Sequence, residues 1–328
     1  MGLAVLGMMQ AVAATAWGGP DVLQPVTVPI PALLPGEVLV RVEAAGVNPT
    51  DWKSRATGGR GLWGDPAILG FDVAGIVEEV ADGSNVLVPG DRVFGMPRFP
   101  LPAAAYAQYV SAPARQLARM PAGLDFADAA SLPLAGLTAL QALEAAGRLR
   151  AGQSVLVCGA GGGVGRLAVQ IAMALGASVT ACARPARLIE ASRWGAAVVE
   201  AAPDGTPGQP SRHDLVIDPF GGERTAALLD WCAPGGSLVS LIPRTAESVE
   251  QRASKRGIRL RRVVVEPSET GMARIAQWVE LGALRPRVAR TFPLVDAAAA
   301  HRAGERGGLD GKIVLQPWQG SRSQDAMR

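Results

Sequence analysis

The sequence predicts an α/β protein that combines a β-rich part with a doubly wound parallel sheet. Residues 9 to about 120 form many short strand-like segments separated by Pro and Gly. From about residue 125 to 265, strand-like and helix-like segments alternate, which is typical of a parallel sheet. A chain of 328 residues is long enough for two domains. We therefore expect one domain at 126–266 and another formed by 1–125 together with 267–328.

Composition sets the class of protein. Hydrophobic residues make up 48% and charged residues 19% of the chain, and the net charge is only +3, which predicts a soluble globular protein and gives no case for a nucleic-acid or membrane partner. Cys158, Cys182 and Cys232 lie in apolar segments and are expected to be reduced, buried thiols. The apolar start at 1–8 lacks a basic region and is too short for a signal peptide, so we expect a cytoplasmic protein.

Alternation of apolar and polar residues places the strands of the β-rich part. A Pro-Gly turn at 89–90 separates two of them. After residue 265 we expect a helix at 270–281, a short helix at 295–303 and a strand that returns to the β-rich part at 312–315. The earlier expected strands lie at 9–14, 37–44, 75–80 and 91–95.

A glycine-rich turn between a strand and a helix is the most informative local feature. The apolar segment 154–158 leads into Gly159-Ala160-Gly161-Gly162-Gly163-Val164-Gly165, and a helical pattern follows to Gly176. Glycines allow a sharp turn and close approach to a phosphate, while the N–H groups at the helix start face an anion. A second strand at 178–182 completes a βαβ unit. This order predicts a Rossmann dinucleotide site, the alternative being a glycine-rich loop without a ligand.

The end of the second strand indicates which dinucleotide binds. An acidic residue at this place, near Ala183, accepts hydrogen bonds from the ribose of NAD. No Asp or Glu occurs between Gly176 and Ile189, and the strand instead leads into Arg184 and Arg187. A guanidinium matches the geometry of a phosphate dianion, so we expect recognition of the 2′-phosphate of NADPH, mainly by Arg184. The alternative is that both arginines are simply solvated.

Several motifs in a fixed order resemble the medium-chain dehydrogenase/reductase superfamily, and within it the zinc-independent quinone oxidoreductase (zeta-crystallin-like) branch. The resemblance covers nearly the whole chain and implies a GroES-like substrate domain beside the Rossmann NADPH-binding domain. The motifs are Ala45-Gly46-Val47-Asn48-Pro49-Thr50-Asp51-Trp52-Lys53, Gly70-Phe71-Asp72-Val73-Ala74-Gly75, Pro89-Gly90-Asp91-Arg92-Val93, Leu134-Ala135-Gly136-Leu137-Thr138-Ala139, the glycine turn and Gly311-Lys312-Ile313-Val314-Leu315.

The zinc-binding residues of related alcohol dehydrogenases are missing. Those enzymes have a Cys where this chain has Asn48, and a His-Glu pair where it has Phe71-Asp72. A catalytic zinc needs about three protein ligands. Only His213 and His301 occur in the chain, both far from these positions and expected to be structural. We therefore expect no metal.

The resemblance also implies which residues form the site. It places Asn48 and Thr138 beside the nicotinamide and the substrate, as catalytic and cofactor-binding residues; for Thr138 the alternative is a structural threonine near a helix start. Apolar substrate contacts are expected from aromatic residues that could equally be core: Trp52, Trp63, Phe71, Phe94 and Phe99. The remaining cofactor-binding residues are Gly159, Gly162, Gly163, Val164, Gly165, Arg184, Arg187, Asp218, Phe220, Leu241 and Lys312.

Lys53 is a candidate catalytic residue because only Lys53, Lys255 and Lys312 occur in a chain that otherwise uses Arg. Many quinone reductases of the family have Tyr at this position, whereas some enoyl reductases related to polyketide synthesis have Lys. An ammonium can donate a proton or stabilise an oxyanion. A solvated loop lysine is the alternative. Asp51 would either pair with Lys53 or cap the following turn.

These features together predict an NADPH-dependent oxidoreductase. Without a metal, the feasible reaction is hydride transfer to a polarised acceptor, namely a quinone or an activated C=C bond of an enone or enoyl compound. The alternatives are a tailoring enoyl reductase on a polyketide-type intermediate and a non-catalytic NADPH-binding redox sensor. The family commonly pairs two sheet edges across a two-fold axis, so we also expect a homodimer through the alternating segment 259–265.

Overall fold

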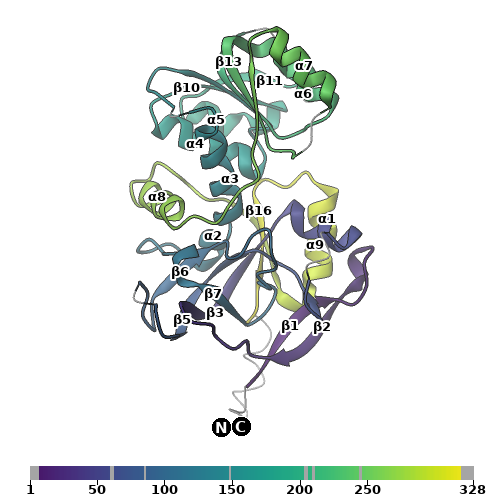
Figure 1. The fold of residues 1–328 in the computed structure, drawn as a ribbon, viewed down its shortest axis with the longest axis vertical. Helices are drawn as coiled ribbons and strands as arrows, with labels where there is room; N and C mark the ends of the chain where they lie inside the picture. Colours follow the sequence, from purple (N-terminus) through teal and green to yellow (C-terminus); the bar gives the residue numbers. More distant parts are fainter. Residues whose placement is uncertain are drawn as a thin grey trace. The chain divides into compact units, whose positions relative to one another are not determined.

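A computed structural model describes residues 7–59, 63–84, 86–147, 149–202, 206–208, 211–243 and 246–318. Residues 1–6 of the apolar start at 1–8 lie outside these residues, as do 319–328. The chain forms two compact units (Figure 1). The first comprises 1–134, 266–280 and 286–328, so the C-terminal part of the chain joins the N-terminal part. The second comprises 135–265 and 281–285.

The first unit is β-rich and contains two sheets. A three-stranded sheet has the order β2-β1-β4, and a seven-stranded sheet has the order β15-β16-β3-β5-β6-β8, with β7 paired to β3. All pairs are antiparallel except β15 with β16. The strands are β1 (Met8–Ala14), β2 (Leu23–Pro29), β3 (Glu37–Val47), β4 (Ala67–Ile68), β5 (Asp72–Val80), β6 (Arg92–Gly95), β7 (Tyr109–Pro113), β8 (Leu117–Arg119), β15 (Val288–Pro293) and β16 (Lys312–Gln316).

Among the described residues, four α-helices lie wholly within the first unit: α1 (Pro49–Thr57), α2 (Phe126–Ala130), α8 (Glu269–Glu280) and α9 (Ala297–Arg306). Helix α2 contacts β3, β5 and β16, and this packing explains why residues 126–134 group with the first unit and not with the second, where the sequence boundary put them. Helix α8 contacts β8, and α9 contacts β16 and α1.

The second unit is a six-stranded sheet with the order β11-β10-β9-β12-β13-β14. Every pair in it is parallel, and the order reverses direction between β9 and β12, as in a doubly wound fold. This arrangement confirms the predicted fold class. The strands are β9 (Ser154–Cys158), β10 (Ser178–Ala183), β11 (Ala197–Glu200), β12 (His213–Asp218), β13 (Cys232–Ser240) and β14 (Arg259–Arg262); the helices are α3 (Pro133–Glu144, which enters from the first unit), α4 (Gly163–Ala174), α5 (Ile189–Arg193), α6 (Glu223–Leu228) and α7 (Glu247–Lys255).

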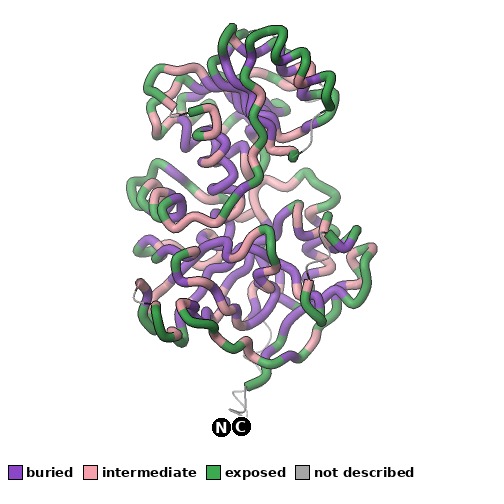
Figure 2. The backbone as a smooth tube through the Cα atoms, viewed as in Figure 1, coloured by how far each residue is buried: buried purple, intermediate pink, exposed green. Residues whose placement is uncertain are grey.

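Each unit has its own buried core, drawn in purple in Figure 2. In the first unit, Val38, Val40 and Val42 on alternate positions of β3 are fully buried in one cluster. In the second unit, Leu156 of β9 and Val216 of β12 are fully buried in another. Cys158, Cys182 and Cys232 are buried thiols in no disulfide, as predicted. None of the described helices is long and apolar enough to cross a membrane.

Candidate functional site

The glycine turn after β9 forms a cradle for an anion. Gly159 has a φ of +66°, which favours glycine, and Gly162 caps the N-terminus of α4. The first backbone bond of the helix runs from the Arg166 N–H to the Gly162 carbonyl. The N–H groups of Gly163, Val164 and Gly165 therefore have no acceptor within the helix. The residues present fit the pyrophosphate of a dinucleotide, which needs donors of this kind.

Close packing inside the turn depends on Gly165. A Cβ atom on this residue would lie 2.2 Å from the Gly159 carbonyl oxygen and 2.9 Å from the Ala160 Cα atom. Since real Cβ contacts essentially never fall below 3.0 Å, the turn and the first turn of α4 can approach each other only with glycine here. The close packing of the turn against the start of α4 is thus built into the backbone.

Three further predicted residues gather at the carboxyl ends of the parallel strands. Asp218 ends β12 and is fully buried; its carboxylate accepts hydrogen bonds from the Phe220 N–H (2.8 Å) and the Thr225 hydroxyl (2.6 Å). Its carbonyl accepts one from the Leu241 N–H (2.8 Å). The Phe220 ring would be 3.7 Å from a Cβ on Gly159. Asp218 therefore shapes the loop that places Phe220 beside the glycine turn.

The two predicted cations lie where β10 ends. The strand stops at Ala183, the position anticipated from the sequence, and the exposed Arg184 caps a 3-10 turn that ends with Arg187. The aliphatic part of Arg187 crosses the glycine turn, because a Cβ on Gly161 would lie 2.5 Å from the Arg187 Cβ atom. Both guanidinium groups thus belong to the loop region at the end of β10, and the contact between Arg187 and Gly161 was not foreseen.

In the first unit, Asn48, Asp72 and Lys312 meet in a polar cluster. The Asn48 side-chain amide donates to Asp72 Oδ2 (2.8 Å), and its Oδ1 accepts from the Lys312 ammonium. Lys312 also donates to the Val47 carbonyl (3.0 Å) and lies 3.9 Å from Asp72 Oδ2. The second oxygen of Asp72 accepts from the Leu134 N–H (2.8 Å). The structure therefore bonds the two predicted residues Asn48 and Lys312 directly, and it adds the carboxylate of Asp72, whose role the sequence did not indicate.

Burial governs the titration of this cluster. It raises the pKa of Asp72 to about 6, although Lys312 and the hydrogen bond from Asn48 act in the opposite direction. Burial also lowers the pKa of Lys312, against the attraction of Asp72 and Asp51. The pKa of Asp51 is raised to about 7, again mainly by burial. Two carboxyl groups and one ammonium thus share one nearly water-free region.

Asp51 caps α1 and does not serve as a salt-bridge partner of Lys53. Its Oδ2 accepts from the Asn48 backbone N–H at 2.7 Å, which is the capping alternative foreseen from the sequence. Lys53 is exposed on the same helix. The assignment of Lys53 to proton donation stays a prediction.

A second buried chain of polar groups runs beside Asp51. The His301 ring bonds the Tyr106 hydroxyl through Nε2 (3.0 Å) and the Arg55 guanidinium through Nδ1 (3.3 Å). Because Arg can only donate, Nδ1 accepts and Nε2 carries the proton. Burial and the charge of Arg55 lower the pKa of His301 to about 3, so the ring is neutral at physiological pH. Arg55 in turn pairs with Glu305 (2.5 Å). His301 therefore lies in a buried hydrogen-bond network.

The predicted substrate residues separate into two groups. Phe71 lies between Trp63 (ring centroids 5.9 Å apart) and Phe99 (4.9 Å). Trp52 instead packs edge-on against His301, with ring centroids 6.3 Å apart, and Phe94 is fully buried in β6. Trp63, Phe71 and Phe99 therefore form one aromatic cluster, whereas Trp52 and Phe94 occupy packing positions.

Thr138 and His213 belong to the second unit. Thr138 is buried in α3, six positions into that helix. His213 begins β12, is buried, and bonds the Ser211 hydroxyl through Nε2 (2.8 Å). Within the described part of the chain, no group of three or more His, Cys, Asp or Glu residues could hold a metal ion.

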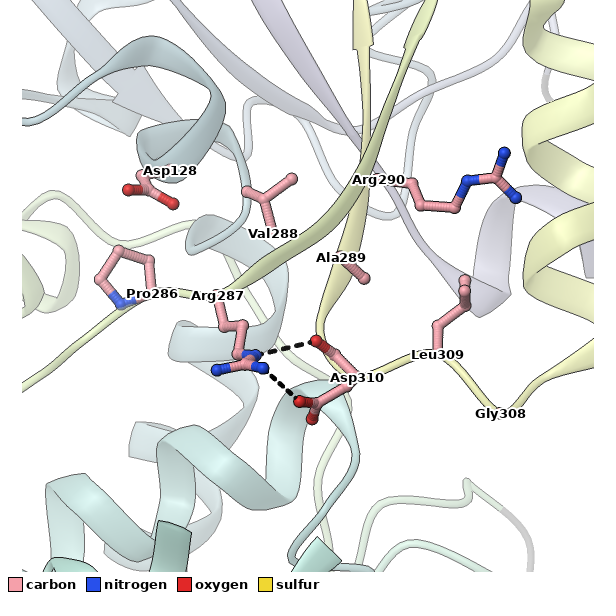
Figure 3. A pocket seen from close by; sticks show the side chains of 9 residues that line it. All are labelled: Asp128, Pro286, Arg287, Val288, Ala289, Arg290, Gly308, Leu309 and Asp310. Carbon is pink, nitrogen blue, oxygen red and sulfur yellow. Dashed lines mark hydrogen bonds and ion pairs between the residues drawn. The ribbon is translucent and has the colours of Figure 1, made fainter.

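The first unit also contains an open cavity of about 590 Å³ at the start of β15 (Figure 3). Arg287 crosses it to Asp310, with an ion pair of 2.5 Å and a bond of 3.1 Å from its Nε to the Asp310 carbonyl. The lining residues include none of the predicted site residues. They are Asp128, Pro286, Arg287, Val288, Ala289, Arg290, Gly308, Leu309 and Asp310.

Comparison with known proteins connects these features to a family. Residues 34–122 match the model of the alcohol dehydrogenase GroES-like domain, and residues 196–315 match that of the zinc-binding dehydrogenase domain. The quinone oxidoreductase of Lama guanicoe is 30% identical over 328 residues, which cover 94% of this chain and 97% of that protein. The chain belongs to the quinone oxidoreductase branch of the medium-chain dehydrogenase/reductase superfamily. It is therefore a member of an NAD(P)-binding oxidoreductase family.

Two other relatives carry different names. The spectinabilin polyketide synthase system protein NorB of Streptomyces orinoci is 35% identical over 297 residues, but the match spans 86% of this chain and only 13% of NorB. The 2-methylene-furan-3-one reductase of Solanum lycopersicum is 31% identical over 94% of this chain and 79% of its own length. Members similar to this chain thus include a protein named for enone reduction and part of a polyketide synthase.

Solved structures of the family agree with the fold. The quinone oxidoreductase from Coxiella burnetii superimposes with a TM-score of 0.86 at 31% identity, covering 94% of this chain and 99% of that one. An NAD-dependent alcohol dehydrogenase gives 0.83 at 31% identity over 94% and 99%. A mycobacterial protein in complex with NADPH gives 0.81 at 28% identity over 94% and 100%. The similar solved structures therefore include one protein named for NAD and one bound to NADPH.

Proposed function

We propose that this protein is an NADPH-dependent reductase that transfers hydride to a quinone or to an activated C=C bond, without zinc. The observation that carries the proposal is a glycine turn in contact with Arg187, with Arg184 at the end of β10, in a chain with no acidic residue between Gly176 and Ile189. Two cations in place of an acid favour the 2′-phosphate of NADPH over the free ribose of NADH.

The class of acceptor is supported by the names of similar proteins. Quinone oxidoreductases and a furanone reductase are similar to this chain over most of its length. The similarity to NorB favours a second candidate, a tailoring enoyl reductase acting on a polyketide-type intermediate. Lys53 also favours this second candidate, because some related enoyl reductases have Lys at this position. A non-catalytic NADPH-binding redox sensor is the third candidate.

The residues divide the work of the proposed reaction. Bound NADPH supplies the hydride. The N–H groups of Gly163, Val164 and Gly165 bind the pyrophosphate, while Asn48 and Thr138 orient the reacting groups. Trp63 and Phe99, which pack on the buried Phe71, provide apolar contacts for a conjugated acceptor. Lys53 delivers the proton that follows hydride addition. A homodimer and a cytoplasmic location complete the proposal.

A turnover assay tests this function. The purified chain is mixed with NADPH or NADH and with 1,4-benzoquinone or 2-cyclohexenone, and oxidation of the nucleotide is followed by absorbance. We expect NADPH oxidation with at least one acceptor, and the same rate after prolonged treatment with a metal chelator. Tight NADPH binding without turnover of either acceptor supports the redox sensor. Loss of activity together with one zinc per chain contradicts the zinc-free reaction.

Nucleotide preference gives a first mutational prediction. Arg184→Ala should weaken NADPH binding by roughly 1.5–3 kcal/mol, the scale of a hydrogen bond to a charged group, and should leave NADH binding nearly unchanged. Fluorescence titration with both nucleotides measures this difference. Arg193→Ala, an exposed arginine of α5, is the matched control. Equal losses for both nucleotides would remove Arg184 from the 2′-phosphate site.

Assembly gives a second prediction. Strand β14 is an edge of the six-stranded sheet, and Val264 just beyond it is 45% exposed. Pairing of this edge with a second copy would satisfy its free backbone groups. Light scattering at micromolar concentration should therefore give twice the 33.8 kDa of one chain. Val264→Asp should shift the mass toward the monomer, whereas Val198→Asp on the opposite edge strand β11 should not. A monomeric wild-type protein would contradict the proposed dimer.

A further inference from the structure

Lys312 is an ammonium with part of its hydrogen-bonding capacity left over. Two of its three N–H donors bond the Val47 carbonyl and Asn48 Oδ1. Asp72 Oδ2 lies 3.9 Å away, beyond hydrogen-bond distance. Among the described residues, the third donor has no hydrogen-bonded acceptor. The Lys312 side chain is 11% exposed, whereas that of Asp72 is completely buried. The Lys312 side chain, unlike that of Asp72, therefore keeps some solvent contact, and its third N–H is the donor left for a ligand.

Other cations of the first unit are committed elsewhere or lie outside the cluster. Arg55 donates to the Gly18 carbonyl, to His301 and to Glu305, so all three guanidinium nitrogens are engaged. Lys53 is exposed on α1. Both ends of the Asn48 amide are held by Asp72 and Lys312, which fixes the position of the ammonium. The charge of Asp72 opposes the lowering of the Lys312 pKa by burial, because an opposite charge favours the ionised form.

We infer that the Lys312 ammonium is the catalytic group that stabilises the negative charge developing on the substrate carbonyl oxygen. This inference rests on the proposed function and names the residue that performs its electrostatic step. In an enone, the β-carbon gains a C–H bond with the two electrons of the hydride, and the nicotinamide is oxidised. The C=C pair moves to the bond between the α-carbon and the carbonyl carbon, and the carbonyl pair moves to oxygen.

The third N–H of Lys312 then donates to this oxygen, while the α-carbon takes a proton and restores the carbonyl. Lys312 keeps its own proton throughout. A preorganised donor in a region of low polarity is worth much more than one in water, because no reorganisation is needed when the charge appears. Reduction of a quinone places negative charge on an oxygen in the same way, so Lys312 should serve both classes of acceptor.

The test compares Lys312→Met with two matched variants. Lys255→Met is the control for loss of a lysine, because Lys255 is exposed on α7 and lies outside the proposed site. Lys312→Met/Asp72→Asn, compared with Asp72→Asn alone, avoids leaving an unpaired buried carboxylate if the single variant unfolds. For each protein we measure thermal unfolding, the NADPH dissociation constant, and kcat with 2-cyclohexenone and 1,4-benzoquinone at saturating NADPH.

Loss of Lys312 should lower kcat by roughly 10²-fold with both acceptors, the scale of one lost oxyanion donor, at an NADPH dissociation constant within threefold of the reference. Weaker NADPH binding with unchanged kcat at saturation would instead make Lys312 a nucleotide contact, as the family resemblance implies, and would overturn the inference. So would unchanged values in both measurements. Failure of the proposed function would look different: the wild-type protein itself would then turn over neither acceptor.

Discussion

Replacing Gly165 with alanine should abolish dinucleotide binding while leaving the first unit folded. The added Cβ atom would lie 2.2 Å from the Gly159 oxygen and 2.7 Å from the Gly159 carbonyl carbon, and both are backbone atoms that cannot rotate away. The turn must therefore open, and the N–H groups at the start of α4 move out of register with the pyrophosphate. We expect NADPH to bind at least about 10²-fold more weakly, which corresponds to about 2.7 kcal/mol.

Fluorescence titration with NADPH measures this effect, and circular dichroism checks that the variant is folded. Gly19→Ala is the control, because Gly19 has an ordinary φ of −69° and no atom within 4 Å of its added Cβ. NADH binding should fall by the same factor as NADPH binding, since the pyrophosphate is common to both. A folded Gly165→Ala protein that binds NADPH within threefold of wild type would show that the glycine turn is not the phosphate cradle.

The nucleotide-binding part of the site could be predicted from the sequence because its residues lie close together along the chain. The glycine turn, α4 and β10 follow one another within a single βαβ unit, and parallel strands bring their carboxyl ends to one edge of the sheet. The end of β10 at Ala183 could therefore be located by counting residues. The sequence could not predict that the Arg187 side chain packs across Gly161, because this contact depends on the 3-10 turn after β10.

The polar cluster of Asn48, Asp72 and Lys312 could not be predicted from neighbouring residues in the sequence. Asn48 is 24 positions from Asp72 and 264 from Lys312, and β16 is brought beside β3 only when the C-terminal part of the chain returns. Arg55 and His301 are 246 positions apart. Motif resemblance indicated Asn48 and Lys312 separately, but not that they bond each other or that Asp72 holds them. A buried Asp directly after Phe71, at the start of β5, was the available signal.

Lys53 and Lys312 are proposed to act in different steps, Lys53 as the proton donor and Lys312 as the oxyanion donor, so experiments can separate the two proposals. Lys312 is held by three groups of the cluster and is proposed to keep its proton. Lys53 is exposed on α1 and can exchange protons with water. An enone needs both an oxyanion donor and a proton for its α-carbon. A quinone needs the first much more than the second, because a hydroquinone anion is stabilised by its ring and collects protons from water.

Lys53→Ala should accordingly lower kcat with an enone by roughly 10²-fold or more, the scale of a lost general acid. NADPH affinity should change little, because Lys53 belongs to the first unit and the phosphate cradle to the second. The loss with a quinone should be clearly smaller. Lys53→Arg should restore only part of the rate, since Arg keeps the charge but does not release a proton near neutral pH.

Steady-state kinetics of both variants with 2-cyclohexenone and 1,4-benzoquinone measure these differences, together with NADPH titrations. Lys255→Ala, on the exposed surface of α7, controls for the loss of one lysine charge. Equal losses with both acceptors would assign Lys53 to charge stabilisation and not to proton delivery. An unchanged kcat with the enone would make Lys53 a solvated surface lysine, and the proton would then have to come from water.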